Sequence, residues 1–346
     1  MKINRVGVDL AKNVFQLHGV DRKGKALWKR RLTRGKWLAV LCDTVEPGTE
    51  IGMEACAGAH HWARQLMQRG YPVKVIPPQF VKPFVKSNKN DAKDAAAICE
   101  AMGRPDMYPV KVKTVEQQDL QAMHRIRDEI KGHRIAKANQ IRGLVTEYGL
   151  VAPQQLSALR SAIPDWLEDA DNGLTFLFRQ LLQGLWGDLY ALDQRMTELD
   201  KQVVVVAQED PTAKRLQQLR GVGPLIATAL VATIGDGKQY RKGRDMAAAL
   251  GLTPRQHSSG GKDRLLGISK RGDSYLRCLL VHGARSAMRT AKDKDDRLSR
   301  WIINLQARRH ANVVAVAMAN KMARMAWVIM TRDVDYDPDL AAASVS

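Results

Sequence analysis

The first hundred residues alternate short apolar runs with amphipathic segments. Three early runs, at 3–8, 14–20 and 26–32, are separated by turn-forming polar residues and are typical of a β-meander. Two later apolar runs, at 50–53 and 73–76, are strands that alternate with helical patterns. We therefore expect an α/β domain in which helices cover a mixed sheet.

The middle of the chain has a helical pattern instead. No proline interrupts residues 116–148, where apolar positions share one broad face and the other face is strongly basic. Further along, apolar residues recur at alternating steps of four and three, the spacing of a coiled-coil seam. They are Leu185, Leu189, Leu192, Met196, Leu199, Val203 and Val206. Self-association and an antiparallel hairpin within one chain both fit this pattern.

A third, mostly helical region follows, with apolar helical segments at 275–290 and 313–330. The second segment contains Lys321 and Arg324, so we expect no membrane span. The tail from Asp335 onward is expected to be poorly ordered. These patterns predict three domains, at residues 1–150, 151–210 and 211–346.

Charge favours a polyanionic partner. The 346 residues include 55 Lys and Arg against 36 Asp and Glu, a formal net charge of +19. Each phosphate that a cation neutralises releases condensed counterions, so such an excess favours nucleic acid, although a basic surface with no partner is the simpler alternative.

The cysteines and the N-terminus indicate a cytoplasmic protein. The four cysteines are scattered without metal-ligand spacing, which argues against a zinc site or a disulfide framework and is typical of a reducing compartment. Arg5 and Asp9 interrupt the N-terminal stretch before an apolar signal-peptide core can form. We expect a soluble cytoplasmic protein.

Four carboxylates lie where catalytic acids are useful. Asp9 and Glu54 each end an apolar strand, and Asp91 and Asp94 are three residues apart at the start of a helix, on one face. Acids from two strand ends and one helix turn can converge on Mg²⁺, with Mn²⁺ as a substitute. Two such ions, about 3.5–4 Å apart, promote attack at a phosphodiester.

Each acid also has a local alternative role, as a turn residue, a helix cap or a partner of the helix dipole. Glu54 is the hardest to explain in this way, because an acid that ends an apolar strand is poorly solvated. The order Asp, Glu, then Asp-x-x-Asp is more specific than any one acid.

The segment LRGVGPLIATAL, at 219–230, forms a second motif. Gly221 and Gly223 allow a tight turn between two short helices, whose amides can face a phosphate oxygen. This pattern predicts a helix-hairpin-helix, which holds the DNA backbone without reading its sequence. A packing corner between helices is the alternative.

The third motif is a basic block at 251–280 around the loop Ser258-Ser259-Gly260-Gly261. Its predicted nucleic-acid contacts are Arg255, Lys262, Arg264, Lys270, Arg271 and Arg277. A serine hydroxyl becomes a nucleophile only when a base, a metal or positive charge activates it. Taken alone, the loop is more typical of a simple turn.

Together, these motifs resemble the DEDD transposases of bridge-RNA-guided bacterial insertion sequences, which are serine recombinases with a RuvC-like domain. The resemblance covers nearly the whole chain, in order. It implies an α/β ribonuclease H-like (RuvC-like) domain at 1–150, a helical coiled-coil middle, and a mostly α C-terminal transposase domain with the helix-hairpin-helix.

The resemblance also implies roles for individual residues. Asp9, Glu54, Asp91 and Asp94 become the metal ligands, and Ser259 becomes the nucleophile that joins covalently to DNA, with Ser258 as its local rival. The implied partners are donor DNA, target DNA, a structured noncoding guide RNA and further copies of the chain, as a dimer or tetramer. On charge alone, the basic segments at 82–93 and 116–148 are expected RNA sites.

Two other functions use part of these features. A RuvC-like junction nuclease would need the acids but would attack with water, which leaves the C-terminal block without a role. A non-catalytic nucleic-acid-binding scaffold would need only the charge.

Overall fold

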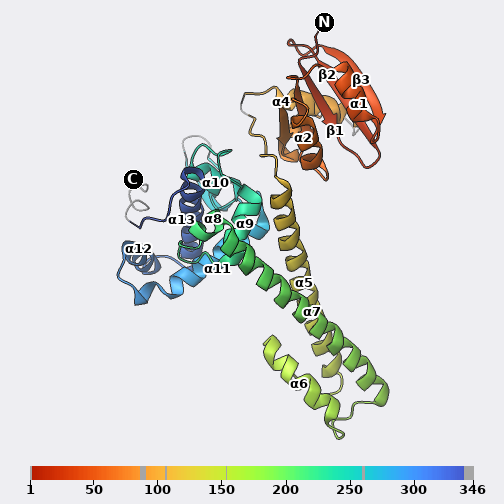
Figure 1. Ribbon diagram of the computed structural model, residues 1–346. Helices are drawn as coiled ribbons and strands as arrows, with labels where there is room; N and C mark the ends of the chain where they lie inside the picture. The colour runs from red at the N-terminus through yellow and green to blue at the C-terminus, as the bar shows by residue number, and fades with distance from the viewer. Residues whose placement is uncertain (1, 86–90, 106, 153, 259–261, 339–346) are drawn as a thin grey trace. The chain divides into compact units, whose positions relative to one another are not determined.

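A computed structural model describes residues 2–85, 91–105, 107–152, 154–258 and 262–338 (Figure 1). The chain forms two compact units, Met1–Val115 and Glu116–Ser346. The domain limits at 150 and 210 stay a prediction. The first compact unit itself ends where the long helix α5 (Val115–Thr146) begins.

Unit 1 contains a five-stranded sheet with the order β3-β2-β1-β4-β5. The strands are β1 (Arg5–Asp9), β2 (Val14–Val20), β3 (Ala26–Thr33), β4 (Glu50–Glu54) and β5 (Val73–Ile76). β2 is antiparallel to both β1 and β3, whereas β1, β4 and β5 are mutually parallel. The predicted meander followed by strand–helix alternation is thereby confirmed as a mixed α/β sheet.

Helices cover both faces of this sheet. Val6, Val8 and Met53 are fully buried in a cluster with residues of α1 (Trp37–Thr44) and α2 (Ala59–Met67). The alternate position Gly7 faces α4 (Asp91–Met102) instead, because successive strand residues point to opposite faces. Between β5 and α4 lie α3 (Pro78–Val81) and the 3₁₀ helix η1 (Lys82–Phe84).

Three helices begin unit 2: α5, α6 (Leu156–Glu168) and α7 (Phe176–Glu209). α5 and α7 run antiparallel and are linked by ion pairs. These are Arg127 Nε to Asp200 Oδ1 at 2.6 Å, Arg134 Nη1 to Asp193 Oδ1 at 3.5 Å, and Lys137 Nζ to Asp188 Oδ2 at 3.1 Å. The basic face of α5 is therefore partly occupied by acids of the same chain.

The predicted seam lies along α7. Leu189, Met196 and Val203 are buried, whereas the alternate seam positions, such as Leu185 and Leu192, are half-buried. Leu189 shares a buried cluster with Ala138 and Ile141 of α5. The coiled-coil assignment itself stays a prediction. Self-association through the seam stays a prediction.

The rest of unit 2 is mostly helical, as predicted. It comprises α8 (Pro211–Leu216), α9 (Pro224–Ile234), α10 (Gly243–Ala249), β6 (Pro254–Gln256), β7 (Leu265–Ile268), α11 (Ser274–Arg289), η2 (Ala291–Asp293), α12 (Arg297–Gln306) and α13 (Ala311–Arg332). α13 packs against α8, α10, α11 and α12 (Figure 1).

Among the described residues, α13 alone is long and apolar enough to cross a membrane, but 56% of its most apolar stretch is buried inside the unit. Met318 and Met322 are fully buried there, and the Nζ of Lys321 lies 5.1 Å from the Trp301 ring centroid. α13 is thus the central core helix of this part of the unit.

Candidate active site and nucleic-acid interface

Asp9 and Glu54 lie side by side at one edge of the sheet. β1 and β4 are neighbouring parallel strands whose register pairs Val8 with Met53, and each acid directly follows that pair. Neighbouring strands are about 4.8 Å apart, so the two half-buried carboxylates can approach one ligand. The strand-end placement predicted from the sequence is confirmed for both residues.

The Cys56 thiol lies near both Asp9 and Glu54. Partial desolvation raises the pKa of Cys56, and the negative charges of Glu54 and Asp9 raise it further. Both carboxylates therefore act electrostatically on one sulfur just beyond the end of β4. Cys56 has no signal in the sequence, because its spacing from Glu54 along the chain does not reveal that Asp9 is also near.

α4 brings its first turn to the same edge. A Cβ added at Gly7 would lie 2.3 Å from the Ala95 carbonyl oxygen, and Cys99 Sγ donates to the Arg5 carbonyl at 3.9 Å. The helix thus runs antiparallel to β1. Asp91 is four residues before Ala95, a distance of about 6 Å along the helix axis. Asp9 is two residues after Gly7, a distance of about 6.6 Å along the strand. Asp91 and Asp9 therefore lie at about the same level.

The two acids of α4 are described to different extents. The helix begins at Asp91, as predicted, and Asp94 is half-buried in its first turn. The side chain of Asp91 lies outside the described residues. The backbone accordingly places Asp91 and Asp94 at the edge that carries Asp9 and Glu54, while the meeting of all four side chains stays a prediction.

The chemistry of these donors suits a hard cation. Carboxylate oxygens are the ligands that Mg²⁺ prefers, usually through one or two carboxylates and several waters. Asp9 and Glu54 fit such a role. Within the described part of the chain, no three His, Cys, Asp or Glu side chains lie close enough together to hold a metal ion.

The segment that contains Gly221 and Gly223 joins α8 to α9. Gly221 has a φ of 84° and packs against Gly283 of α11. Gly223 is extended, caps α9 ahead of Pro224, and would bear a Cβ with nothing within 4 Å. The first glycine thus serves packing, whereas the second lies open beside the first turn of α9.

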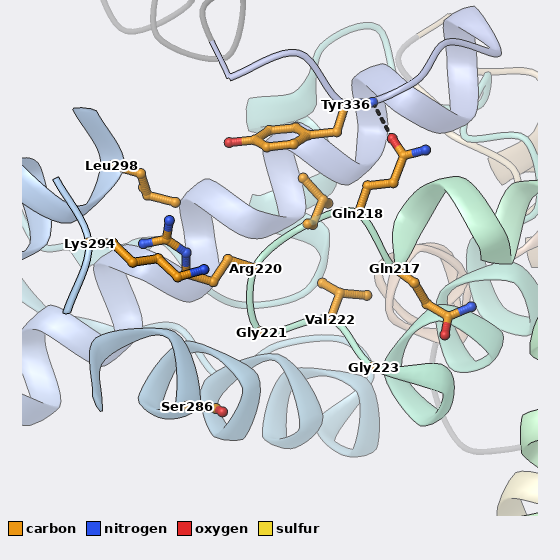
Figure 2. Close-up of a pocket in the computed structure, with 11 residues that line it drawn as sticks. Gln217, Gln218, Arg220, Gly221, Val222, Gly223, Ser286, Lys294, Leu298 and Tyr336 are labelled. Atoms are coloured by element: carbon orange, nitrogen blue, oxygen red, sulfur yellow. Dashed lines mark hydrogen bonds between the residues drawn. The ribbon is translucent and has the colours of Figure 1, made fainter. Parts of the chain in front are cut away.

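This loop, hereafter the hairpin loop, lines a hollow of about 420 Å³, hereafter the hairpin pocket (Figure 2). Both names refer to the predicted helix-hairpin-helix, which stays a prediction. The lining residues are Gln217, Gln218, Leu219, Arg220, Gly221, Val222, Gly223, Ser286, Lys294, Leu298 and Tyr336. Gln218 Oε1 accepts a hydrogen bond from the Tyr336 backbone N–H at 2.7 Å, drawn as the dashed line in Figure 2. The tail segment around Tyr336 therefore forms one wall, contrary to the disorder predicted for that part of the tail, whereas residues 339–346 lie outside the described residues.

The two cations of the hairpin pocket, Arg220 and Lys294, differ in their interactions with the rest of the chain. Arg220 is ion-paired with Asp296 and donates to Ser299 Oγ at 2.5 Å. Partial burial opposes ionisation of Asp296, but hydrogen bonds from Arg220 and Ser299 prevail and lower its pKa to about 2. Arg220 is thereby held by an internal acid, which leaves Lys294 as the cation better suited to an outside phosphate.

Within the basic block, β6 and β7 form a two-stranded ribbon, and α11 begins at Ser274. Ser259, Gly260 and Gly261 lie outside the described residues, so the predicted nucleophile has no described position. Ser258 Oγ accepts a hydrogen bond from Gln256 Nε2 at 2.9 Å. The choice of Ser259 over Ser258 as the reactive serine stays a prediction.

The predicted basic contacts divide into two groups. Arg255, Lys262, Arg264, Lys270 and Arg271 are exposed. Arg277, by contrast, donates to the backbone carbonyls of Leu250 at 3.1 Å and Arg271 at 2.7 Å. Its guanidinium fixes the loop before α11, and its predicted contact with nucleic acid stays a prediction.

A buried polar triad that the sequence analysis missed joins α5, α9 and α11. His124 is 4% exposed, with Nδ1 3.0 Å from Tyr275 Oη and Nε2 3.0 Å from Thr228 Oγ1. Burial, aided by the positive charge of Arg127, lowers the pKa of His124 to about 4. The ring is therefore neutral at pH 7 and serves to align the three helices.

Two family models match the chain. Residues 6–150 match a model described as "Transposase", of the DEDD type of IS110, and residues 213–299 match "Transposase IS116/IS110/IS902 family". The first covers Asp9, Glu54, Asp91 and Asp94, and the second covers the hairpin loop and the β6–β7 ribbon.

Similar proteins extend over nearly the whole chain. A "Probable family 20 transposase" of Pseudomonas aeruginosa is 45% identical over 98% of this chain and 100% of its own length. The "Transposase for insertion sequence element IS1111A" of Coxiella burnetii is 43% identical, over 96% of this chain and 91% of its own. The corresponding transposase of element IS1328 from Yersinia enterocolitica is 40% identical, over 95% and 97%.

Proposed function

The chain belongs to the IS116/IS110/IS902 family of transposases, and from that premise we propose how it cuts and rejoins DNA. The acids Asp9, Glu54, Asp91 and Asp94 form a ribonuclease H-like active site, and Ser259 is the nucleophile. The observation that carries this proposal is the convergence of two strand ends, β1 and β4, with the first turn of α4 at one edge of the sheet.

Bound Mg²⁺ would supply charge neutralisation at the phosphate and lower the proton affinity of the attacking hydroxyl. Asp9 and Glu54 would hold such ions, with Asp91 and Asp94 completing the set. Exposed cations of the ribbon, such as Arg255 and Arg264, stabilise the negative charge that develops on the phosphoryl oxygens.

In the reaction, the serine oxygen forms a bond to phosphorus while the bond from phosphorus to the leaving strand oxygen breaks. The proton of the serine hydroxyl leaves to a base or solvent, and the departing oxygen takes one up. The phosphodiester is conserved as a serine ester, so a hydroxyl of a second strand can reseal it without ATP.

We propose that an RNA from the element pairs with both DNA partners, which leaves the protein to bind backbone and shape. Part of the positive charge of α5 is neutralised within the chain. Arg127, Arg134 and Lys137 are paired with acids of α7, whereas Arg125 and Lys131 are exposed. Sequencing the nucleic acid that copurifies with the protein tests guidance, because a discrete RNA species is expected and random cellular RNA would contradict it.

A suicide DNA substrate tests the chemistry. Wild-type protein with Mg²⁺ and its copurifying RNA should leave a covalent protein–DNA adduct, which Ser259→Ala and Asp9→Asn should each abolish. Ser258→Ala and Asp43→Asn are matched controls, one the neighbouring serine and the other an exposed acid of unit 1. Normal cleavage by Ser259→Ala without an adduct would indicate a water-using nuclease, and unchanged transposition in Asp9→Asn and Glu54→Gln would indicate a scaffold.

A further inference from the structure

The β6–β7 ribbon exposes apolar side chains that the fold does not use. Pro254 pairs with Ile268 and Gln256 with Leu265 across the ribbon. Leu265 is 67% exposed and Leu266 is 40% exposed, and neither belongs to the core of unit 2. Exposure alone does not identify a contact, because single exposed apolar side chains are common on protein surfaces. Leu265 is a candidate contact because it is exposed on the same ribbon as several exposed cations.

Positive charge surrounds these leucines. Arg255 of β6 and the segment before β7, with Lys262 and Arg264, are exposed. The acid of that segment, Asp263, accepts a hydrogen bond from Gln256 Nε2 at 3.2 Å. A surface that combines cations with a protruding aliphatic side chain is complementary to DNA, which presents phosphates beside apolar base faces and thymine methyl groups.

We propose that the ribbon is a DNA-docking element in which Leu265 contacts a base in a groove, while Arg255, Lys262 and Arg264 contact the flanking phosphates. This inference rests on the proposed function, since the same ribbon leads to Ser259. A two-stranded ribbon fits the major groove, and aliphatic side chains of other proteins contact thymine methyls or enter between base steps.

A protein partner fits the ribbon less well. Stable protein interfaces bury about 1,200 Å² or more in total, which two leucines on a narrow ribbon cannot supply. The cations around them would also need an acidic partner surface. Against DNA, by contrast, the phosphates supply the affinity and Leu265 needs only one base contact.

The test is fluorescence anisotropy of the full-length protein on a labelled mixed-sequence 30-bp duplex over a salt series. Leu265→Ser should weaken binding about 3- to 10-fold and leave the slope of log K against log salt unchanged, because an apolar contact releases no counterions. Lys262→Ala and Arg264→Ala should each lower that slope by about one. Leu265→Met should retain the wild-type affinity.

Leu177→Ser is the matched control, because Leu177 of α7 is 66% exposed and should not alter DNA affinity. An unchanged affinity in Leu265→Ser would overturn the proposal. So would a lower mass by light scattering with intact DNA binding, which would assign Leu265 to a contact with a second copy. Failure to find a covalent adduct through Ser259 would contradict the proposed function without affecting this test. The reason is that duplex affinity does not require the nucleophile.

Discussion

Gly221 of the hairpin loop and Gly283 of α11 meet backbone to backbone. A Cβ at Gly221 would lie 2.3 Å from the Gly283 carbonyl oxygen, and a Cβ at Gly283 would lie 2.2 Å from the Gly221 carbonyl oxygen. The two glycines therefore allow an approach that no other residue permits. This contact fixes the loop between α8 and α9 against α11, on the wall of the hairpin pocket.

Alanine at either glycine should destabilise unit 2. The added methyl would displace backbone rather than a flexible side chain, and at Gly221 it would also strain a left-handed φ, so we expect a loss of about 2–3 kcal/mol in unfolding free energy. Urea denaturation followed by circular dichroism measures the effect. Gly223→Ala is the control, because its Cβ would contact nothing within 4 Å, and an equal loss there would contradict the packing role of Gly221.

Charge at Gly223 should affect DNA rather than folding. Gly223→Asp places a carboxylate beside the open first turn of α9, where we expect a phosphate. Binding should weaken for all duplex sequences, with a shallower dependence on salt, because fewer counterions are released. Anisotropy from 50 to about 200 mM salt measures this. The same affinity and slope as wild type would remove the hairpin loop from the DNA interface.

Local pattern was sufficient for several elements and for the strand-end acids. Val14–Val20 and Val73–Ile76 are strands with the predicted limits, because an alternating or continuous apolar run bounded by turn residues has few other solutions. Asp9 and Glu54 could be placed because acids that end parallel neighbouring strands necessarily share an edge.

Other features required tertiary structure. Nothing local shows that Arg127, Arg134 and Lys137 pair with acids of α7, some fifty to seventy positions away. The free positive charge of α5 is therefore smaller than its sequence indicates, and its contact with nucleic acid stays a prediction. The order of the tail around Tyr336 likewise depends on Gln218, 118 positions earlier. α12 was missed although Leu298, Trp301, Ile302 and Leu305 have amphipathic helical spacing.

The approach of α4 to the sheet makes a further prediction. Gly7→Ala would press a methyl against backbone atoms of α4, at 2.3 Å from the Ala95 carbonyl oxygen and 2.6 Å from the Cys99 nitrogen. The helix must move outward, which carries Asp91 and Asp94 away from Asp9. We expect DNA cleavage to fall at least about 100-fold, because small misplacements of reacting groups are costly.

Gly52→Ala is the comparison for that variant. Its methyl would first meet the Met102 sulfur, at 2.6 Å, which is the far part of a flexible side chain. The effect on cleavage should therefore be much smaller than in Gly7→Ala, at matched thermal stability. Equal losses would mean that the position of α4 does not control activity.

The His124 triad predicts a pH dependence of stability. Thr228 Oγ1 donates to the Pro224 carbonyl at 2.8 Å, so it accepts from His124 Nε2–H, and Nδ1 accepts from the Tyr275 hydroxyl. The folded ring, with a pKa of about 4, stays neutral where an unfolded histidine takes up a proton, below about pH 6.5. As the pH falls from 6.5 to 4, this group should therefore lower the free energy of unfolding by about 1.4 kcal/mol per pH unit.

His124→Gln removes the titrating ring and should abolish that part of the pH dependence. At pH 7 the variant should be less stable than wild type, because the triad loses its geometry, and the difference should shrink as the pH falls towards 5. Urea denaturation at pH 7, 6 and 5 measures it.

His133→Gln, on the exposed face of the same helix, is the control. His60, whose pKa burial also lowers to about 4, contributes equally to wild type and variant and cancels in the difference. A stability difference that is constant with pH would show that His124 is not held neutral by the fold.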